Sequence, residues 1–380
     1  MRTAASTVAA PSLVLALIAA SPSLAADCDQ VSVDRVPLSE LLGETYLGFP
    51  GGLYPGGGNV PPPQHASAGV AIARAICPLA ADGSVDHVGG KIVVVSVGMS
   101  NTSMEFSRFR QLAQQTPGLE PRLVLVNGAQ GGQDVTQTAD PGSDYWHVLE
   151  QRLATAGVTS AQVQVVWLKQ ALAGPSGSFP ASAMPLYAGL RATVTNIKEK
   201  LPNARLCFLS SRSYGGYAAT PLNPEPYAYE SAFAVRWTIA DQIGGDTELN
   251  YSPSLGPVNA PWIGWGPYLW ADGLTPRADG LIWECSDFAA DGVHPAPDGQ
   301  QKVAELLMQF FTGNPATRPW FLDAGPADLD GDGKVDGADI GILLASWGPC
   351  SGCPADLNGN GNVGGADLGI LLAAWEPCGG

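Results

Sequence analysis

Three side chains that lie far apart in the sequence have the types and settings needed for nucleophilic catalysis. Ser100 comes three residues after the apolar run Lys91–Val97, so we expect it at a strand-to-helix turn. Asp291 and His294 lie three residues apart, before the last amphipathic stretch. A carboxylate at this spacing can fix the tautomer of the imidazole, whose other nitrogen then accepts the proton of a serine hydroxyl. This chemistry is acyl transfer.

The sequence alone also allows simpler interpretations of the same residues. Ser100 could serve only as a helix N-cap, and Asp291 and His294 only as a capping carboxylate and a surface imidazole. Other histidines compete as the base, but none has an Asp placed so closely in a loop after a candidate strand: His65, His87 and His147.

The segments around these side chains predict an α/β fold. From about Lys91 to Gly313, β-rich apolar runs alternate with amphipathic stretches, which is typical of a parallel sheet flanked by helices. The expected strands are Lys91–Val97, Arg122–Val126, Gln162–Leu168, Arg205–Ser210 and Gly280–Trp283. The expected helices are Met104–Gln115, Met184–Leu201, Ser231–Ile243 and Asp298–Phe311. Sites in such folds lie beyond the carboxyl ends of the strands, where Ser100 falls.

Taken together, these blocks resemble the SGNH (GDSL-type) hydrolases over about residues 91–313. The family's first block, Gly-Asp-Ser, reads Gly98-Met99-Ser100 here, and its last block, Asp-x-x-His, is present as Asp291 to His294. The resemblance implies a flavodoxin-like three-layer parallel sheet and a serine esterase. Ser100 would be the nucleophile, His294 the general base and Asp291 the group that orients it, with no metal or organic cofactor in the chemistry.

The resemblance also implies an oxyanion hole. The segment Leu125–Gly132 looks like the family's second block, with Gly132 as the oxyanion glycine and Gly131 as a register alternative. The N–H of Ser100 would be another donor. The third block normally presents Asn after a strand, whereas this chain has Gln170, which could equally be a plain polar residue at a strand end. Losing one such donor can cost about a hundredfold or more in rate.

The C-terminal part contains a repeat at an offset of 28 residues whose oxygen-bearing side chains have calcium-loop spacing. Ligands are needed at loop positions 1, 3, 5, 7, 9 and 12, with Gly at 6. The first copy offers Asp328, Asp330, Asp332, Lys334 (through its carbonyl), Asp336 and Asp339. The second offers Asp356, Asn358, Asn360, Asn362, Gly364 and Asp367. With fewer carboxylates, the second copy should bind Ca²⁺ more weakly.

Each loop runs into a short apolar stretch, Ala338–Trp347 and Ala366–Trp375, and the two predicted helices should bury each other. Because the core is so small, calcium should be part of the folding free energy. Residues 325–380 resemble cysteine-bearing dockerin modules, which also have Asp at position 12. The resemblance implies two structural Ca²⁺ sites and docking to a cohesin-like partner, with retention on a cell surface as an open alternative.

The sequence indicates the substrate class through two aromatic segments and through the C-terminal module. Residues 45–65 and 251–273 are rich in Gly, Pro and aromatic residues, including Trp262, Trp265, Tyr268 and Trp270. They could form a platform for sugar rings or could pack in the core. By association with dockerin-bearing enzymes, we expect an ester or acetylated carbohydrate and deacetylation of a glycan. A catalytically silent glycan-binding or surface protein is the alternative, and paired carboxylates at Glu284 and Asp287 raise a glycosidase as a third reading.

Composition narrows the class of protein. Lys and Arg total 19 against 35 Asp and Glu, a net charge of -16, which disfavours binding to nucleic acid. Arg2, an apolar run to about Ala20 and the small residues around Ala25 predict a secretory signal peptide and a secreted or extracellular protein. Later segments are too short or too polar to span a membrane.

Seven cysteines follow the predicted cleavage point, so disulfides are expected. Cys28 with Cys77 and Cys207 with Cys285 are the predicted pairs, and Cys350-x-x-Cys353 has a spacing that zinc or redox sites use. The expected organisation is a signal peptide (1–25), an irregular N-terminal extension (26–90), the hydrolase-like domain (91–313), a linker (314–324) and the calcium module (325–380).

Overall fold

The computed structural model describes residues 1, 25–323, 325–330 and 335–375 of the 380-residue chain. The predicted signal peptide lies outside the described residues apart from its two ends. Within the described residues, no helix combines the length and apolarity needed to cross a bilayer.

Five parallel strands form the central sheet: β3 (Ile92–Gly98), β4 (Leu123–Asn127), β5 (Val163–Lys169), β6 (Leu206–Leu209) and β7 (Trp262–Trp265). Their order is β4-β3-β5-β6-β7. In strand sequence this is 2-1-3-4-5, the flavodoxin-like order. Every residue of β3 and β5 is buried, which explains the predominantly apolar runs that mark them in the sequence. The predicted α/β fold is confirmed.

One predicted strand is wrong. Residues Gly280–Trp283 contain no strand, and the fifth strand is β7, in the Gly- and Pro-rich stretch that the sequence favours as a loop. The aromatic side chains of this region are buried, with Trp262, Trp265, Tyr268 and Trp270 each at most 6% exposed. The core-packing interpretation of these residues is therefore correct, and they form no exposed platform for sugar rings.

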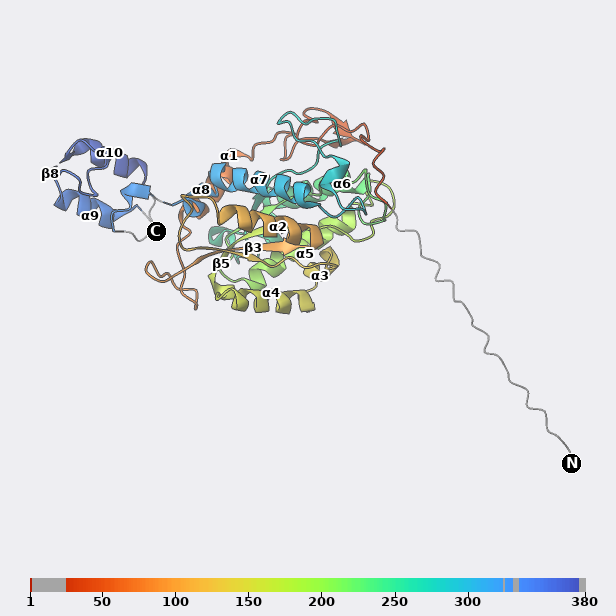
Figure 1. Cartoon of the computed structure of the whole chain (residues 1–380), viewed down its shortest axis with the longest axis horizontal. Coiled ribbons are helices and arrows are strands. Elements are labelled where there is room, and N and C mark those ends of the chain that lie inside the picture. The colour runs from red at the N-terminus through yellow and green to blue at the C-terminus, as the bar shows by residue number, and fades with distance from the viewer. Residues whose placement is uncertain (2–24, 324, 331–334, 376–380) are drawn as a thin grey trace.

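Helices cover both faces of the sheet (Figure 1). On one side lie α1 (Pro63–Arg74), α2 (Ser100–Ala113) and α7 (Pro297–Gly313), and on the other α3 (Val135–Ala139), α4 (Asp144–Thr155) and α5 (Met184–Lys200). Helix α6 (Tyr227–Ile243) packs against α5 and β7. All four predicted helices form, and α2 begins at Ser100 itself. The extension expected to be irregular contains α1 and the hairpin of β1 (Thr45–Tyr46) and β2 (Phe49–Pro50).

Short 3₁₀ turns lie at Ser160–Gln162, Thr247–Leu249, Pro253–Leu255, Cys285–Asp287 and Gly325–Ala327.

The C-terminal module has its own small core. Helix α8 (Arg318–Phe321) precedes it, and α9 (Gly337–Ala345) and α10 (Gly365–Ala373) pack against each other, as the repeat predicts. Strands β8 (Gly348–Pro349) and β9 (Asn362–Val363) pair antiparallel between them. Its buried apolar residues form a cluster separate from the main core: Ala327, Val335, Leu343, Ala355, Val363 and Leu371.

The disulfides differ from the predicted pairs. Cys28 pairs with Cys285 and Cys350 with Cys353. Both predicted pairs are therefore wrong, since each used one of the cysteines now joined together. Cys77 and Cys207 are buried, and Cys378 lies outside the described residues. With Cys350 and Cys353 joined to each other, their thiolates are not available as zinc ligands.

Candidate active site

The structure brings Ser100, His294 and Asp291 into one hydrogen-bonded chain. The Oγ of Ser100 lies 2.8 Å from Nε2 of His294, and Nδ1 of the same ring lies 2.5 Å from Oδ2 of Asp291. The His294 and Asp291 side chains are 28% and 32% exposed, so the site is open to a substrate from solvent. A hydroxyl, an imidazole and a carboxylate thus stand in the order that acyl transfer needs.

Ser100 is held in place by the tight junction between β3 and α2. Gly98 ends β3, and a Cβ there would come within 2.2 Å of the Lys169 carbonyl oxygen and 2.4 Å of Thr102 Oγ1. Only glycine fits this approach of two neighbouring strand ends. The hydroxyl of Thr102 also donates to the Lys169 carbonyl, at 2.7 Å, which fixes the first turn of α2 on the end of β5. Met99, where the hydrolase family has Asp, is buried in the N-cap position.

The Asp291 carboxylate is oriented at both oxygens. Its Oδ1 accepts hydrogen bonds from the backbone N–H groups of Val293 and His294, each at 3.0 Å, while Oδ2 faces the imidazole. Partial burial opposes ionisation of this group, but these hydrogen bonds outweigh it and hold the pKa of Asp291 below its usual value. Asp291 therefore stays ionised and keeps the proton of His294 on Nδ1.

Asn101, which is not among the predicted site residues, links the Ser100 turn to the segment that carries His294. Its side chain is 2% exposed, and Nδ2 donates to the backbone carbonyl of Val293 at 2.8 Å. The residue after the nucleophile thus holds the residue before the base. No feature of the sequence indicates that position 101 reaches position 293.

Replacing Asn101 with Ala should lower the rate of acyl transfer to Ser100 by about ten- to a hundredfold, because a small shift of His294 away from Ser100 misaligns proton transfer. The loss should fall on kcat and leave KM nearly unchanged. The control is Gln114→Ala, at the exposed end of the same helix. Steady-state kinetics of both variants measure the difference, and equal rates would show that Asn101 does not position the base.

The segment after β4 lies beside the nucleophile. The N–H of Gln130 donates to the Gly98 carbonyl at 2.9 Å, which ties this segment to the Ser100 turn. A Cβ placed on Gly131 would lie 3.9 Å from Cβ of Ser100, and Gly132 has a φ of +74°. Ser100 is the first residue of α2, so its N–H has no partner within the helix. Gly131, the register alternative, therefore lies next to Ser100, and the role of Gly132 as the oxyanion glycine stays a prediction.

Gln170 is turned toward the interior. Its side chain is 2% exposed, and Nε2 donates to the Gln133 carbonyl at 3.1 Å and to Thr138 Oγ1 at 3.3 Å. Both amide hydrogens are engaged, so Gln170 can bind an oxyanion only by giving up one of these bonds.

A buried ion pair joins Glu105, about one turn beyond Ser100 on α2, to Lys169 at the end of β5. The Nζ of Lys169 lies 2.5 and 2.6 Å from the two carboxylate oxygens of Glu105, and both side chains are 1% exposed. Burial lowers the pKa of Lys169 to about 8, although Glu105 acts in the opposite direction. A lysine directly after the predicted buried strand Gln162–Leu168 is the sequence signal that a buried partner exists.

The competing residues lie in other settings. His65 is buried and its Nε2 lies 2.8 Å from the Ile263 carbonyl, and His147 is exposed beside Gln151. Asp287, one of the two carboxylates of the glycosidase interpretation, is fully buried, with Oδ2 2.6 Å from Nζ of Lys302 and 2.7 Å from the backbone N of Glu284. Asp287 is thus committed to internal partners.

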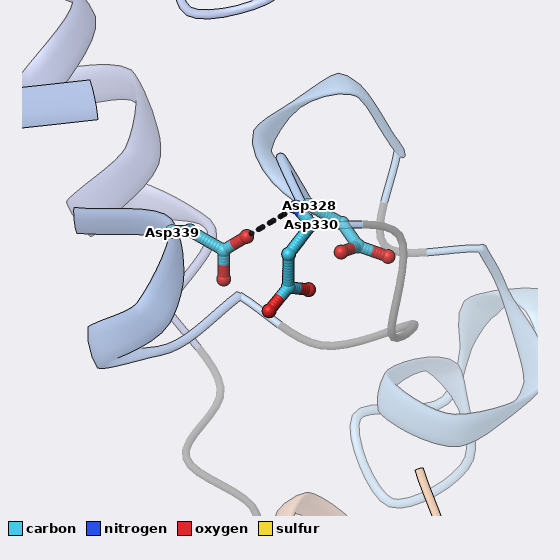
Figure 2. Close-up of side chains that lie close together, drawn as sticks. All are labelled: Asp328, Asp330 and Asp339. Atoms are coloured by element: carbon cyan, nitrogen blue, oxygen red, sulfur yellow. Dashed lines mark hydrogen bonds between the residues drawn. The ribbon is translucent and has the colours of Figure 1, made fainter. Parts of the chain in front are cut away.

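The first calcium-like loop gathers three carboxylates. Asp328 and Asp330 lie close to Asp339 at the start of α9 (Figure 2), and one oxygen of each lies within 4.8 Å of the others. Ligands on one Ca²⁺ at about 2.4 Å each are at most about 5 Å apart, so this spacing fits the ion. Asp339 is fully buried, and its oxygens also accept from the backbone N–H groups of Leu329, Asp330 and Asp336. Asp332 and Lys334 lie outside the described residues.

The second loop has the same plan with amides in place of carboxylates. Asp367 is fully buried and accepts from the backbone N–H groups of Asn358 and Gly364 at 3.1 and 2.8 Å. Asp356 accepts from the N–H groups of Asn360 and Gly361, and the Asn360 side chain accepts from Asn362 N. The loop is therefore closed by its own side-chain oxygens, with Asp367 in the place of Asp339.

Comparisons with known proteins give only distant likeness. No family model matches the chain, and no curated protein matches it. Among solved structures, a protein from Arabidopsis thaliana matches at 15% identity and a TM-score of 0.28, covering 54% of this chain and 67% of its own.

Two further structures match at 14% identity. A gut microbial diltiazem-metabolizing enzyme has a TM-score of 0.33 and coverage of 62% of this chain and 48% of its own. The periplasmic domain of a Salmonella ser. Paratyphi A lipopolysaccharide acetyltransferase has a TM-score of 0.32 and coverage of 58% and 84%. The function is therefore inferred from the side chains beyond the carboxyl ends of the strands, Ser100, His294 and Asp291.

Proposed function

We propose that the chain is a serine esterase that hydrolyses carboxylic esters through an acyl-serine intermediate. The observation that carries the proposal is the continuous chain from Ser100 Oγ through His294 to Asp291, with distances of 2.8 and 2.5 Å. Side chains separated by more than 190 positions thus meet in the order that a serine nucleophile requires.

In the proposed reaction, Ser100 Oγ attacks the ester carbonyl while its proton moves to Nε2 of His294. The carbonyl oxygen becomes an oxyanion beside the N–H groups of Ser100 and of Gly132 or its neighbour Gly131, with Gln170 as a donor only after rearrangement. His294 then protonates the departing alcohol, which leaves the acyl group on Ser100. Water, deprotonated by His294, attacks the acyl-serine and releases the carboxylic acid and free Ser100. Asp291 stabilises the imidazolium in both halves.

The preferred substrate is an acetylated glycan, and the support for it is the dockerin-like module, not the aromatic residues. A dockerin-like module would attach the esterase to a cohesin-like scaffold or a cell-surface partner, and a signal peptide would export it. The first loop would hold Ca²⁺ through Asp328, Asp330 and Asp339, and the second through Asp356, Asn358, Asn360 and Asp367. The ion's role would be structural, with every step of hydrolysis carried by protein side chains.

A fluorophosphonate probe tests the proposal directly. It should label the wild-type protein at Ser100, as mapped by mass spectrometry, and should not label Ser100→Ala. Hydrolysis of short-chain nitrophenyl esters should be lost in the same variant. Absence of labelling and equal, near-zero rates in both proteins would instead favour a catalytically silent binding protein.

A further inference from the structure

The N-terminal segment Ala26–Val36, called the strap from here on, lies against the loop that carries Asp291 and His294. The backbone N of Ala26 donates to the Ala290 carbonyl at 2.7 Å, and that of Asp27 to the Tyr217 carbonyl at 3.0 Å. The next residue, Cys28, forms the disulfide with Cys285. Ala26 and Cys28 thus bind the segment that precedes Asp291. Asp27 binds Tyr217, against which the Asp291 loop packs.

The other end of the strap is anchored on a buried carboxylate. Asp272 is 2% exposed and accepts from Ser32 Oγ at 2.5 Å and from the backbone N of Val33 at 2.8 Å. The Val31 carbonyl also accepts from the backbone N of Leu274, at 2.8 Å. The strap therefore joins the Asp272–Leu274 segment to the Asp291 loop.

The loop that carries Asp291 and His294 has little regular structure of its own. Residues 288–295 are closed by the isolated bridge between Phe288 and Pro295, with Ala289 N donating to the His294 carbonyl at 2.8 Å. Gly292, at φ +67°, packs so closely that a Cβ would come within 1.8 Å of the Tyr217 carbonyl oxygen. That carbonyl is the one that accepts from Asp27, so the strap and Gly292 meet at a single backbone group.

We infer that the strap, held by the Cys28–Cys285 disulfide, positions Asp291 and His294 on Ser100, so that hydrolysis depends on this disulfide. A dithiol or phosphine reductant would transfer two electrons to the disulfide, with two protons forming the Cys28 and Cys285 thiols and the reductant oxidised. Cys28 is exposed, so a reductant in solution can reach the bond. The covalent tie is then lost, and the strap keeps only the hydrogen bonds of Ala26 and Asp27 to this loop and its support. The kinetic part of this inference rests on the proposed esterase function.

The test compares the wild type with the double variant Cys28→Ser, Cys285→Ser, using nitrophenyl ester kinetics and hydrogen–deuterium exchange. We expect kcat to fall by about ten- to a hundredfold with KM nearly unchanged, because the base shifts relative to the nucleophile. Exchange should quicken in residues 286–296 and stay unchanged in β3 and β5. The matched control is Cys350→Ser, Cys353→Ser, which removes the other disulfide and should leave both readouts at wild-type values. A phosphine reductant should reproduce the effect in the wild type and have no effect on the rate of the Cys28 and Cys285 double variant.

The two proposals fail in different ways. If the wild type neither hydrolyses esters nor reacts with a fluorophosphonate, the esterase proposal fails, while exchange in residues 286–296 still reports on the strap. An active double variant with unchanged exchange in that loop would overturn the strap's role. If the variant does not fold, reduction of the folded wild type replaces it. Faster exchange throughout β3 and β5 on reduction would also overturn the inference, because the disulfide would then stabilise the whole domain.

Discussion

Replacing Asp291 with Asn should reduce kcat for ester hydrolysis by about 10⁴-fold while the protein stays folded. The expected loss follows from the hydrogen bonds that the two oxygens of Asp291 accept. Oδ1 accepts from two backbone N–H groups, so the carbonyl oxygen of an Asn must take that position, since an NH₂ group has no acceptor there. The NH₂ group then faces Nδ1 of His294, which must become an acceptor. The ring proton moves to Nε2, where it blocks transfer from Ser100.

The matched control is Asp298→Asn, which makes the same change of charge at an exposed position in the first turn of α7. Its kcat should stay within about twofold of wild type, since exposed charges contribute little. In Asp291→Asn, the residual rate should rise as pH increases, because hydroxide has to replace the base. A loss of less than tenfold in Asp291→Asn would mean that His294 does not act as the base.

Acidification acts on the same carboxylate. The native pKa of Asp291 lies below its usual value, so its hydrogen bonds stabilise the folded loop at pH values above the unfolded pKa. This contribution is lost as pH falls through the depressed native pKa.

The central sheet was predictable because buried parallel strands leave a strong mark in the sequence. The runs that became β3 and β5 are mostly apolar, and both strands are buried along their whole length. Strand β7 has four residues, two of them Trp, within a Gly- and Pro-rich stretch, so composition there favours a loop. Its pairing with β6 is a long-range contact that no local pattern specifies.

The main residues of the candidate site could be predicted from the sequence, but the residues that hold them in place could not. Ser100 and the Asp291–His294 pair stand out because each has a short local pattern at a predicted element boundary. Asn101 has none, since its acceptor lies 192 positions away. Cysteine pairing could not be deduced either, because seven cysteines allow many connectivities and the distance between Cys28 and Cys285 depends on the finished fold.

Removing calcium should unfold the C-terminal module and leave ester hydrolysis unchanged. The module's core consists of a few small apolar side chains, so little hydrophobic burial holds α9 against α10. In the first loop three carboxylates lie within 4.8 Å of one another, and their repulsion opposes folding unless a cation is bound. At a Ca²⁺ concentration a hundred times Kd, one site would add about 2.7 kcal/mol to the stability of the module. Both helices should therefore depend on the ion, whereas Ser100 begins α2, whose Phe106 and Phe109 belong to the separate main core.

Hydrogen–deuterium exchange of the full chain, with Ca²⁺ and then with a chelator, measures this difference. Exchange should quicken in α9 and α10 and stay constant in β3 and β5, with nitrophenyl ester rates equal in the two conditions. Asp339→Asn and Asp367→Asn form a matched pair of variants at position 12 of the two loops. Calorimetric titration should show the larger loss of affinity in Asp339→Asn, because its loop has more carboxylates and should bind the ion more tightly. Unchanged exchange in both helices after chelation would mean that the module folds on its apolar core alone, and the two loops would then be polar turns.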